Sequence, residues 1–191
     1  MIIKKMTIGQ EGSHMIEEAA AFARQAHAGA VRKGTNIPYI THPMETAVIV
    51  SLMKDDEEMI AAAMLHDVIE DAGVTPEELE ERFGSRVTEL VLFETEDKTG
   101  TWSERKSATI ARLKGASREN KILTLGDKLS NLRSTARDYL IVGEDIWLRF
   151  NEKDKSRHGW YYGGVLAELG ELKSYPAYQE YMLLYHKVFG K

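Results

Sequence analysis

The sequence has no cysteine. Disulfide bonds and thiolate metal ligands are therefore excluded, and the absence fits a reducing compartment. No apolar run approaches the roughly 18 residues of a membrane-spanning helix, and the first twelve residues lack the apolar core of a secretory signal. The net charge of −5 is spread along the chain, without the basic face that duplex nucleic-acid binders usually carry. These absences predict a cytoplasmic protein that binds neither membranes nor duplex nucleic acid.

Strand signals are absent as well, because no stretch alternates polar and apolar residues with the β-branched enrichment of a strand. Helical signals dominate instead. The 191 residues are enough for one domain with a sizeable core. We expect an all-α fold, a single domain over residues 1–191 built as a bundle of eight to ten helices, in which residues 1–12 form a poorly ordered or extended segment.

Capping signals place the helix boundaries. Ser13 and Asp55 are candidate N-caps, and Thr75-Pro76 followed by two glutamates is a strong helix start. Glycines follow several of the helical stretches, as at Gly84 and Gly115. The predicted helices cover residues 14–28, 43–53, 56–71, 76–83, 85–93, 102–114, 117–141, 153–171 and 175–188.

The segment Met-Leu-His-Asp-Val-Ile-Glu-Asp, residues 64–71, places four polar residues in an apolar helical pattern. Positions three or four apart share a helix face, so His66, Asp67, Glu70 and Asp71 gather an imidazole and three carboxylates on one surface. Clustered carboxylates raise each other's pKa, and a divalent cation removes that repulsion. Imidazole and carboxylate ligands suit zinc, manganese or iron better than calcium. The segment therefore predicts part of a metal site.

Further ligands must come from elsewhere in the chain. His42 stands at a loop–helix junction, and Asp127 lies in the apolar segment ILTLGDKLSNL, where a lone aspartate is costly to bury. Two histidines and two aspartates leave open positions for water and substrate, as a catalytic metal needs. Glu70 and Asp71, one turn beyond, are placed for proton transfer. Taken singly these are a turn histidine and surface acids, but their combination favours a metal site.

The spacing of His42, His66-Asp67 and Asp127 resembles the metal signature of the HD phosphohydrolase superfamily. Three segments resemble, more narrowly, the hydrolase domain of RelA/SpoT homologues: HAGAVRKGTNIPYITHP (27–43), LHDVIED (65–71) and GDKLSNLR (126–133). The segment EDKTGTWSERK (96–106) is similar to the small, single-domain alarmone hydrolases, and a weaker aromatic match lies at 160–162.

This resemblance implies an HD-domain fold and a Mn²⁺ cofactor, with other divalent transition metals left open. The family hydrolyses the 3′-pyrophosphate of ppGpp or pppGpp to GDP or GTP and pyrophosphate. The metal ligands that the resemblance implies are His42, His66, Asp67 and Asp127, and the residues that activate or position water are Glu70 and Asp71.

The resemblance also implies residues that bind the substrate. Arg32 and Lys33 match an Arg-Lys pair that packs on guanine and faces the phosphates, as a guanidinium plane and an ammonium can do. Asn131, one helical turn beyond a ligand, is expected at the ribose or a phosphate. Arg157 and Tyr161 are similar to a pair near the substrate, although a surface arginine and a half-buried tyrosine explain them equally well.

Four further residues qualify this picture. Ser130 stands where long relatives commonly carry histidine, which leaves substrate preference open. Gly126 replaces a usual alanine and should cost about 1 kcal/mol in a helix interior. We expect Lys98 and Arg105 to balance Glu96 and Glu104 rather than to face the anionic substrate.

Two alternative functions stay open at this point. Another HD phosphohydrolase would act on a nucleoside monophosphate or NADPH, against which the Arg-Lys loop argues. A non-catalytic nucleotide-binding module would have no need of Glu70 and Asp71. The sequence distinguishes neither ppGpp from pppGpp nor a monomer from a homodimer.

Overall fold

The computed structural model describes residues 10–190, with side chains from His14 onward. The described part is all-α, as predicted, and its only strand-like feature is one isolated bridge between Val31 and Pro38. The elements are α1 (Gln10–Ala26), α2 (Thr41–Ser51), α3 (Glu57–Leu65), α4 (Val68–Ala72), α5 (Pro76–Phe83), α6 (Ser85–Glu94), α7 (Trp102–Leu113), α8 (Arg118–Val142), the 3₁₀ helix η1 (Gly143–Arg149), α9 (Lys155–Glu168), the 3₁₀ helix η2 (Gly170–Leu172) and α10 (Pro176–Phe189).

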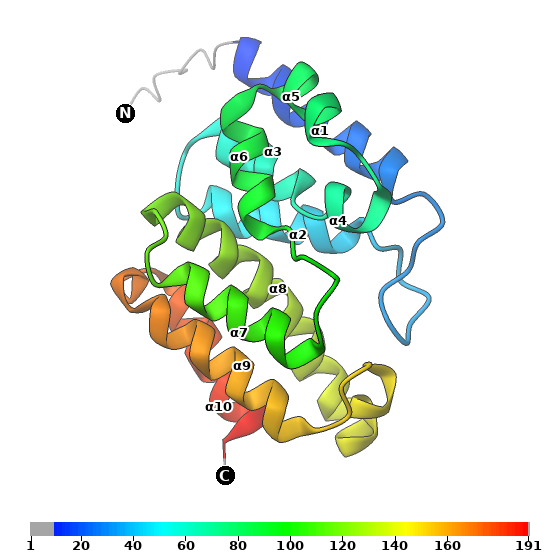
Figure 1. Cartoon of the computed structure of the whole chain (residues 1–191), viewed down its shortest axis with the longest axis vertical. Helices are drawn as coiled ribbons and strands as arrows, with labels where there is room; N and C mark the ends of the chain where they lie inside the picture. Colours follow the sequence, from blue (N-terminus) through cyan, green and yellow to red (C-terminus); the bar gives the residue numbers. More distant parts are fainter. Residues whose placement is uncertain (1–9, 191) are drawn as a thin grey trace, which may run out of the picture.

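Helix α8 connects the two halves of the bundle. Figure 1 shows α1 to α6 gathered at one end and α7, α9 and α10 at the other, with α8 running between them. Helix α8 contacts α2, α3 and α6 on one side, and α10 and η1 on the other. One cluster of buried apolar side chains extends from Ala19 on α1 to Val188 on α10, which favours the predicted single domain. No helix of residues 10–190 is both long and apolar enough to cross a membrane.

Side-chain caps begin three of the helices. The Thr75 side chain accepts from the Glu78 N–H at the start of α5, as predicted, and Ser117 accepts from the Asn120 N–H at the start of α8. At α7, Thr101 and Glu104 form a reciprocal capping box, which was not predicted. These local bonds satisfy backbone donors that have no partner within the helix. Helices α5 and α7 begin at the predicted residues, and α8 begins one residue later, at Arg118.

The predicted start of α1 and the predicted cap of α3 were wrong. Helix α1 begins at Gln10, so Ser13 lies within it, while residues 1–9 of the predicted N-terminal segment lie outside the described part of the chain. Helix α3 is capped by Asp56, whose side chain accepts from the Met59 N–H, and not by Asp55. The 3₁₀ helix η1 was not predicted at all.

The predicted helix 56–71 is also interrupted, by a turn at His66 and Asp67 between α3 and α4. Adjacent residues of a regular helix do not face each other. At the turn the two side chains do face each other, because His66 Nε2 and Asp67 Oδ2 lie 3.1 Å apart. The interruption of the helix therefore allows both side chains to contribute to one site.

Gly126 allows α2 and α8 to pack closely. A Cβ added at this glycine would lie 2.8 Å from Val50 Cγ2 and 3.3 Å from the Thr46 carbonyl oxygen. The close approach brings His42, at the start of α2, toward Asp127, the next residue on α8. Gly126 thus has a packing role that outweighs its poor helix propensity.

Candidate active site

Four of the predicted site residues meet in the middle of the molecule. His42 comes from α2, His66 and Asp67 from the α3–α4 turn, and Asp127 from α8. The two ring nitrogens His42 Nε2 and His66 Nε2 lie 3.1 Å apart. Asp67 Oδ2 is 3.5 Å from His42 Nε2, and Asp127 Oδ1 is 3.2 Å from it. Two imidazoles and two carboxylates therefore converge on one small volume.

Each imidazole is oriented by a hydrogen bond at its other nitrogen. His66 Nδ1 lies 2.8 Å from the Ala63 carbonyl oxygen, which can only accept, so the proton sits on Nδ1. His42 Nδ1 lies 2.8 Å from Ser130 Oγ, and that hydroxyl donates to Glu45 Oε2 over 2.8 Å. Both Nε2 atoms are consequently left with a lone pair that faces the carboxylates, as metal coordination requires.

The charges of the cluster suit a bound cation. Burial alone would raise the pKa of Asp67, but the His66 and His42 imidazoles outweigh it and hold that pKa below its usual range. Burial would lower the pKa of His66, yet Asp67 and Asp127 raise it well above its usual value. A divalent cation held by these groups would pair with both carboxylates and leave both imidazoles neutral.

The donor set fits a divalent metal. His42, His66 and Asp67 each offer one ligand atom, and these atoms lie within 4.8 Å of one another. Asp127 Oδ1 lies 3.7 Å from His66 Nε2 and can complete the set. Nitrogen and carboxylate donors suit first-row transition metals, and four protein ligands leave positions for water or substrate in a five- or six-coordinate ion.

Glu70 and Asp71 lie beside this cluster. Glu70 Oε2 accepts from the Glu96 N–H over 3.0 Å. Burial, with Asp67 and Asp71 nearby, raises the pKa of Glu70. Asp71 accepts from Lys98 Nζ over 2.9 Å. The expectation that Lys98 balances Glu96 was therefore wrong, because the loop after α6 folds Lys98 back onto α4.

The Tyr39 hydroxyl lies between the carboxylates of Asp67 and Asp71. It donates to Asp67 Oδ2 over 2.6 Å and lies 3.2 Å from Asp71 Oδ2. His27, whose ring centroid is 4.9 Å from that of Tyr39, supports the tyrosine from behind. A phenol that spans Asp67 and Asp71 fixes the spacing between the metal cluster and the adjacent acid.

The loop of residues 29–41 is fastened to the cluster through Arg32. The Arg32 guanidinium donates to Asn131 Oδ1 over 2.9 Å, and Asn131 Nδ2 donates to Asp127 Oδ1 over 2.6 Å. Arg32 also lies 5.7 Å from the centroid of the Tyr39 ring. At the tip of the loop, Gly34 has φ +71 and leaves no room for a Cβ beside Arg149.

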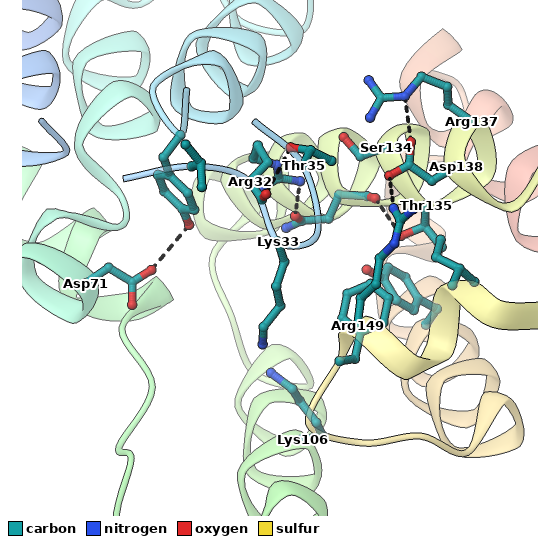
Figure 2. A pocket seen from close by; sticks show the side chains of 16 residues that line it. Arg32, Lys33, Thr35, Asp71, Lys106, Ser134, Thr135, Arg137, Asp138 and Arg149 are labelled. Carbon is teal, nitrogen blue, oxygen red and sulfur yellow. Dashed lines mark hydrogen bonds and ion pairs between the residues drawn. The ribbon is translucent and has the colours of Figure 1, made fainter. Parts of the chain in front are cut away.

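This loop forms one wall of a cavity of about 530 Å³, which we call the loop cavity. Figure 2 shows α8 and η1 forming the opposite walls, with Lys33 extending toward Lys106 on α7. Cations predominate among its charged lining residues, which are Arg32, Lys33, Asp71, Lys106, Arg137, Asp138 and Arg149. A cavity of this size can hold a nucleotide, and its charge favours an anionic one.

The metal cluster lines a second, smaller cavity of about 140 Å³, the central cavity. It shares Tyr39, Asp71, Lys106 and Asn131 with the loop cavity. The two spaces therefore adjoin each other, so a ligand in the loop cavity would lie next to the cluster.

The last two predicted substrate residues lie differently from each other. Tyr161 is buried on a third cavity of about 190 Å³, its hydroxyl has no hydrogen-bond partner, and Lys106 Nζ lies 4.9 Å from its ring centroid. Arg157 instead donates to Glu152 over 2.9 Å, and its side chain is 56% exposed. It lines none of the cavities described here.

Sequence reasoning missed several residues of the site. Lys128 makes an ion pair with Asp127, and Glu94 is a buried carboxylate that accepts from Thr124. Lys106 pairs with Glu96 over 2.5 Å. The only sequence signal for Lys106 and Lys128 was their place inside the segments 96–106 and 126–133.

Comparison with known proteins agrees with this architecture. A family model described as "HD domain" matches residues 19–139. A protein from Xenopus tropicalis named guanosine-3′,5′-bis(diphosphate) 3′-pyrophosphohydrolase MESH1 is 40% identical over 126 residues, which are 64% of this chain and 70% of that protein.

Two solved structures share the fold. The crystal structure of lmo0812 from Listeria monocytogenes superposes with a TM-score of 0.73 at 32% identity, over 78% of this chain and 99% of the other. The structure of a metazoan orthologue of SpoT, described as hydrolysing ppGpp, gives a TM-score of 0.77 at 24% identity over 93% of this chain and 97% of the other. The chain belongs to the HD domain family, as a homologue of MESH1.

Proposed function

We propose that this chain is a metal-dependent hydrolase that removes the 3′-diphosphate of ppGpp or pppGpp, releasing GDP or GTP and pyrophosphate. The observation that carries the proposal is the convergence of His42, His66, Asp67 and Asp127 next to the carboxylates of Glu70 and Asp71. The MESH1 homologue, whose name states this activity, supports the choice of substrate.

In this proposal the four converging residues hold the metal, and Mn²⁺ is the ion that we expect. A bound divalent cation polarises a phosphoryl oxygen and lowers the pKa of water. Ser130 and the Ala63 carbonyl keep both imidazoles turned inward, so the chain holds the ligand set ready before the ion arrives.

Glu70 and Asp71 are the proposed proton acceptors for the attacking water. The raised pKa of Glu70 makes its carboxylate a stronger base than that of an exposed glutamate. Lys98, paired with Asp71, keeps the second carboxylate in place.

The loop cavity is the proposed site of the guanosine moiety. Arg32 is held by Asn131 with its guanidinium near Tyr39, where it can stack on a base. Lys33 stands at the same mouth and is free to pair with phosphate, because it makes no ion pair with any residue in 10–190.

Incubation of the purified chain with ppGpp tests the proposal, with Mn²⁺ either supplied or removed by a chelator. Products are resolved by ion-exchange chromatography. We expect GDP and pyrophosphate only when the metal is present. Intact ppGpp with fully loaded protein would rule the proposal out, and the same preparation would then be tested on NADPH and nucleoside monophosphates. Nucleotide binding without any turnover would indicate a binding module.

A further inference from the structure

A further cavity adjoins the metal cluster. It has a volume of about 350 Å³ and lies at the start of α7, and we call it the α7 cavity. It shares Glu70, Glu96 and Lys106 with the central cavity, and Lys33 and Lys106 with the loop cavity. The central cavity therefore adjoins two larger spaces, the loop cavity beside Asn131 and the α7 cavity beside Glu70.

The α7 cavity carries cations that the protein does not neutralise. Its acids are already paired: Glu96 with Lys106, Glu70 with Lys98, and Glu152 with Arg157. Two further cations on its wall, Lys33 and Arg105, make no ion pair within residues 10–190.

Arg105 is the more informative of these two cations. Its Nε is buried and has no hydrogen-bond partner. A buried donor of a charged group without a partner is costly, so this arrangement calls for an explanation. Arg105 lines the α7 cavity and makes no ion pair with Glu104, contrary to the expectation from the sequence, so an anion in that cavity can pair with its guanidinium.

The chemistry of the proposed reaction identifies that anion, so the inference rests on the proposed function. Water oxygen bonds to the phosphorus next to the ribose, the bond from that phosphorus to the 3′-oxygen breaks, and its electron pair stays on the 3′-oxygen, which takes up a proton. The distal phosphate remains attached to the attacked phosphorus and leaves with it as pyrophosphate. With the nucleoside in the loop cavity and the attacked phosphorus at the metal, the α7 cavity is the adjoining cationic space that remains for the distal phosphate.

We propose that the α7 cavity binds the distal phosphate of the 3′-diphosphate through Arg105 and Lys33, and so selects a 3′-diphosphate over a 3′-monophosphate. Lys33 lines both the loop cavity and the α7 cavity, and thus stands between the nucleoside and the diphosphate. The 5′-phosphates remain on the nucleoside side, where Arg137 and Arg149 line the loop cavity.

An experiment with three nucleotides distinguishes binding of the distal 3′-phosphate by Arg105 from binding of the 5′-phosphates. The substrates are ppGpp, pGpp, which lacks one 5′-phosphate, and ppGp, which lacks the distal 3′-phosphate. For Arg105→Gln we expect kcat/KM on ppGpp and pGpp to fall about 10- to 100-fold, as loss of a charge-assisted hydrogen bond does. The inhibition constant of ppGp should stay unchanged, and Arg105→Lys should recover part of the loss.

The matched control is Lys114→Gln, which removes an exposed cation from the C-terminal end of the same helix. It should behave as the unmodified chain, and thermal unfolding of each variant checks that it folds. The proposal is overturned if Arg105→Gln weakens ppGpp and ppGp while sparing pGpp, if all three weaken equally, or if none changes.

Calorimetric titration with inorganic pyrophosphate and inorganic phosphate, at fixed free Mn²⁺, tests the cavity without turnover. The unmodified chain should prefer pyrophosphate, and Arg105→Gln should lose that preference. Absence of ppGpp turnover together with this preference would remove the proposed function while leaving a diphosphate site. Turnover without the preference would remove the inference alone.

Discussion

The Ser130 hydroxyl connects the His42 imidazole to the Glu45 carboxylate, with 2.8 Å to each. Glu45 is fixed in turn by Arg133, which also pairs with Glu180 on α10. The chain of contacts runs from α10 through α8 to α2. The orientation of one ligand thus depends on three helices, and the serine that departs from long relatives is the link between them.

Ser130→Ala should weaken metal binding while the fold persists. The His42 ring would lose the acceptor that fixes its tautomer, and loss of such support typically costs about 10- to 100-fold in metal affinity. Titration of the apo-protein with Mn²⁺ measures this loss directly. Thr88→Val is the control, because it removes a buried hydroxyl that bonds only to the Gly84 carbonyl on α6. Equal affinities in both variants would mean that Ser130 does not position His42.

Glu70→Gln and Asp67→Asn should separate catalysis from metal binding. Removing the proton acceptor should lower kcat about 10²- to 10⁴-fold and change Mn²⁺ affinity little. Removing a ligand should lower both. Loss of metal from Glu70→Gln would show that the ligands have been assigned wrongly.

Asp56→Ala should destabilise the protein at neutral pH by about 1 kcal/mol, a typical N-cap contribution. Hydrogen bonds from Arg86, and then the Met59 N–H, lower the pKa of Asp56. A lowered folded-state pKa contributes stability that is present above the unfolded value of 3.8 and is lost as the pH falls through the folded value. Urea unfolding of both proteins should therefore show a difference at pH 7 that shrinks below about pH 4.

Asp55→Ala is the matched control for this experiment, since Asp55 is exposed and does not cap α3. Its stability should match the unmodified chain at both pH values. If the variant at Asp55 lost more unfolding free energy than the variant at Asp56, Asp55 would be the cap, as the sequence suggested.

Gly126→Ala should destabilise the protein in spite of the better helix propensity of alanine. The added methyl group would lie 2.8 Å from Val50 Cγ2 and press on the Thr46 carbonyl. Overpacking of this kind costs about 1–3 kcal/mol, against a gain of about 1 kcal/mol in propensity. Denaturant unfolding gives the sign, and adding Val50→Ala should recover part of the loss. Gly115→Ala, where nothing lies within 4 Å, is the control; a stabilised Gly126→Ala would refute the close approach.

Local chemistry explains why much of the fold was predictable. Thr75 with Pro76 is a cap whose effect needs no tertiary context, so α5 begins at the expected residue. Ser117 acts in the same way at α8, which begins within one residue of the predicted start. The spacing of His66 and Asp67 from Glu70 and Asp71 is typical of a metal site. That spacing, together with His42 and Asp127, was enough to predict the convergence that the structure displays.

Tertiary contacts explain what the sequence did not reveal. The interruption at His66 and Asp67 has no glycine or proline to mark it, and it depends on packing around the cluster. Lys106 is one basic residue among several on α7, and only the fold turns it toward the site. Arg149 reaches the loop cavity because η1 bends back beneath α8, which no periodicity in the sequence records.

Lys106 borders the loop, central and α7 cavities as well as the one lined by Tyr161. Changes made in any two of these spaces share this neighbour, so their effects on activity should not add, because residues with a common partner couple. Substitutions that alter binding of the base, the metal or the diphosphate would then affect one another. A new substrate preference in this fold would therefore require coordinated changes. The effect of a substitution in one cavity would depend on whether Lys106 is kept.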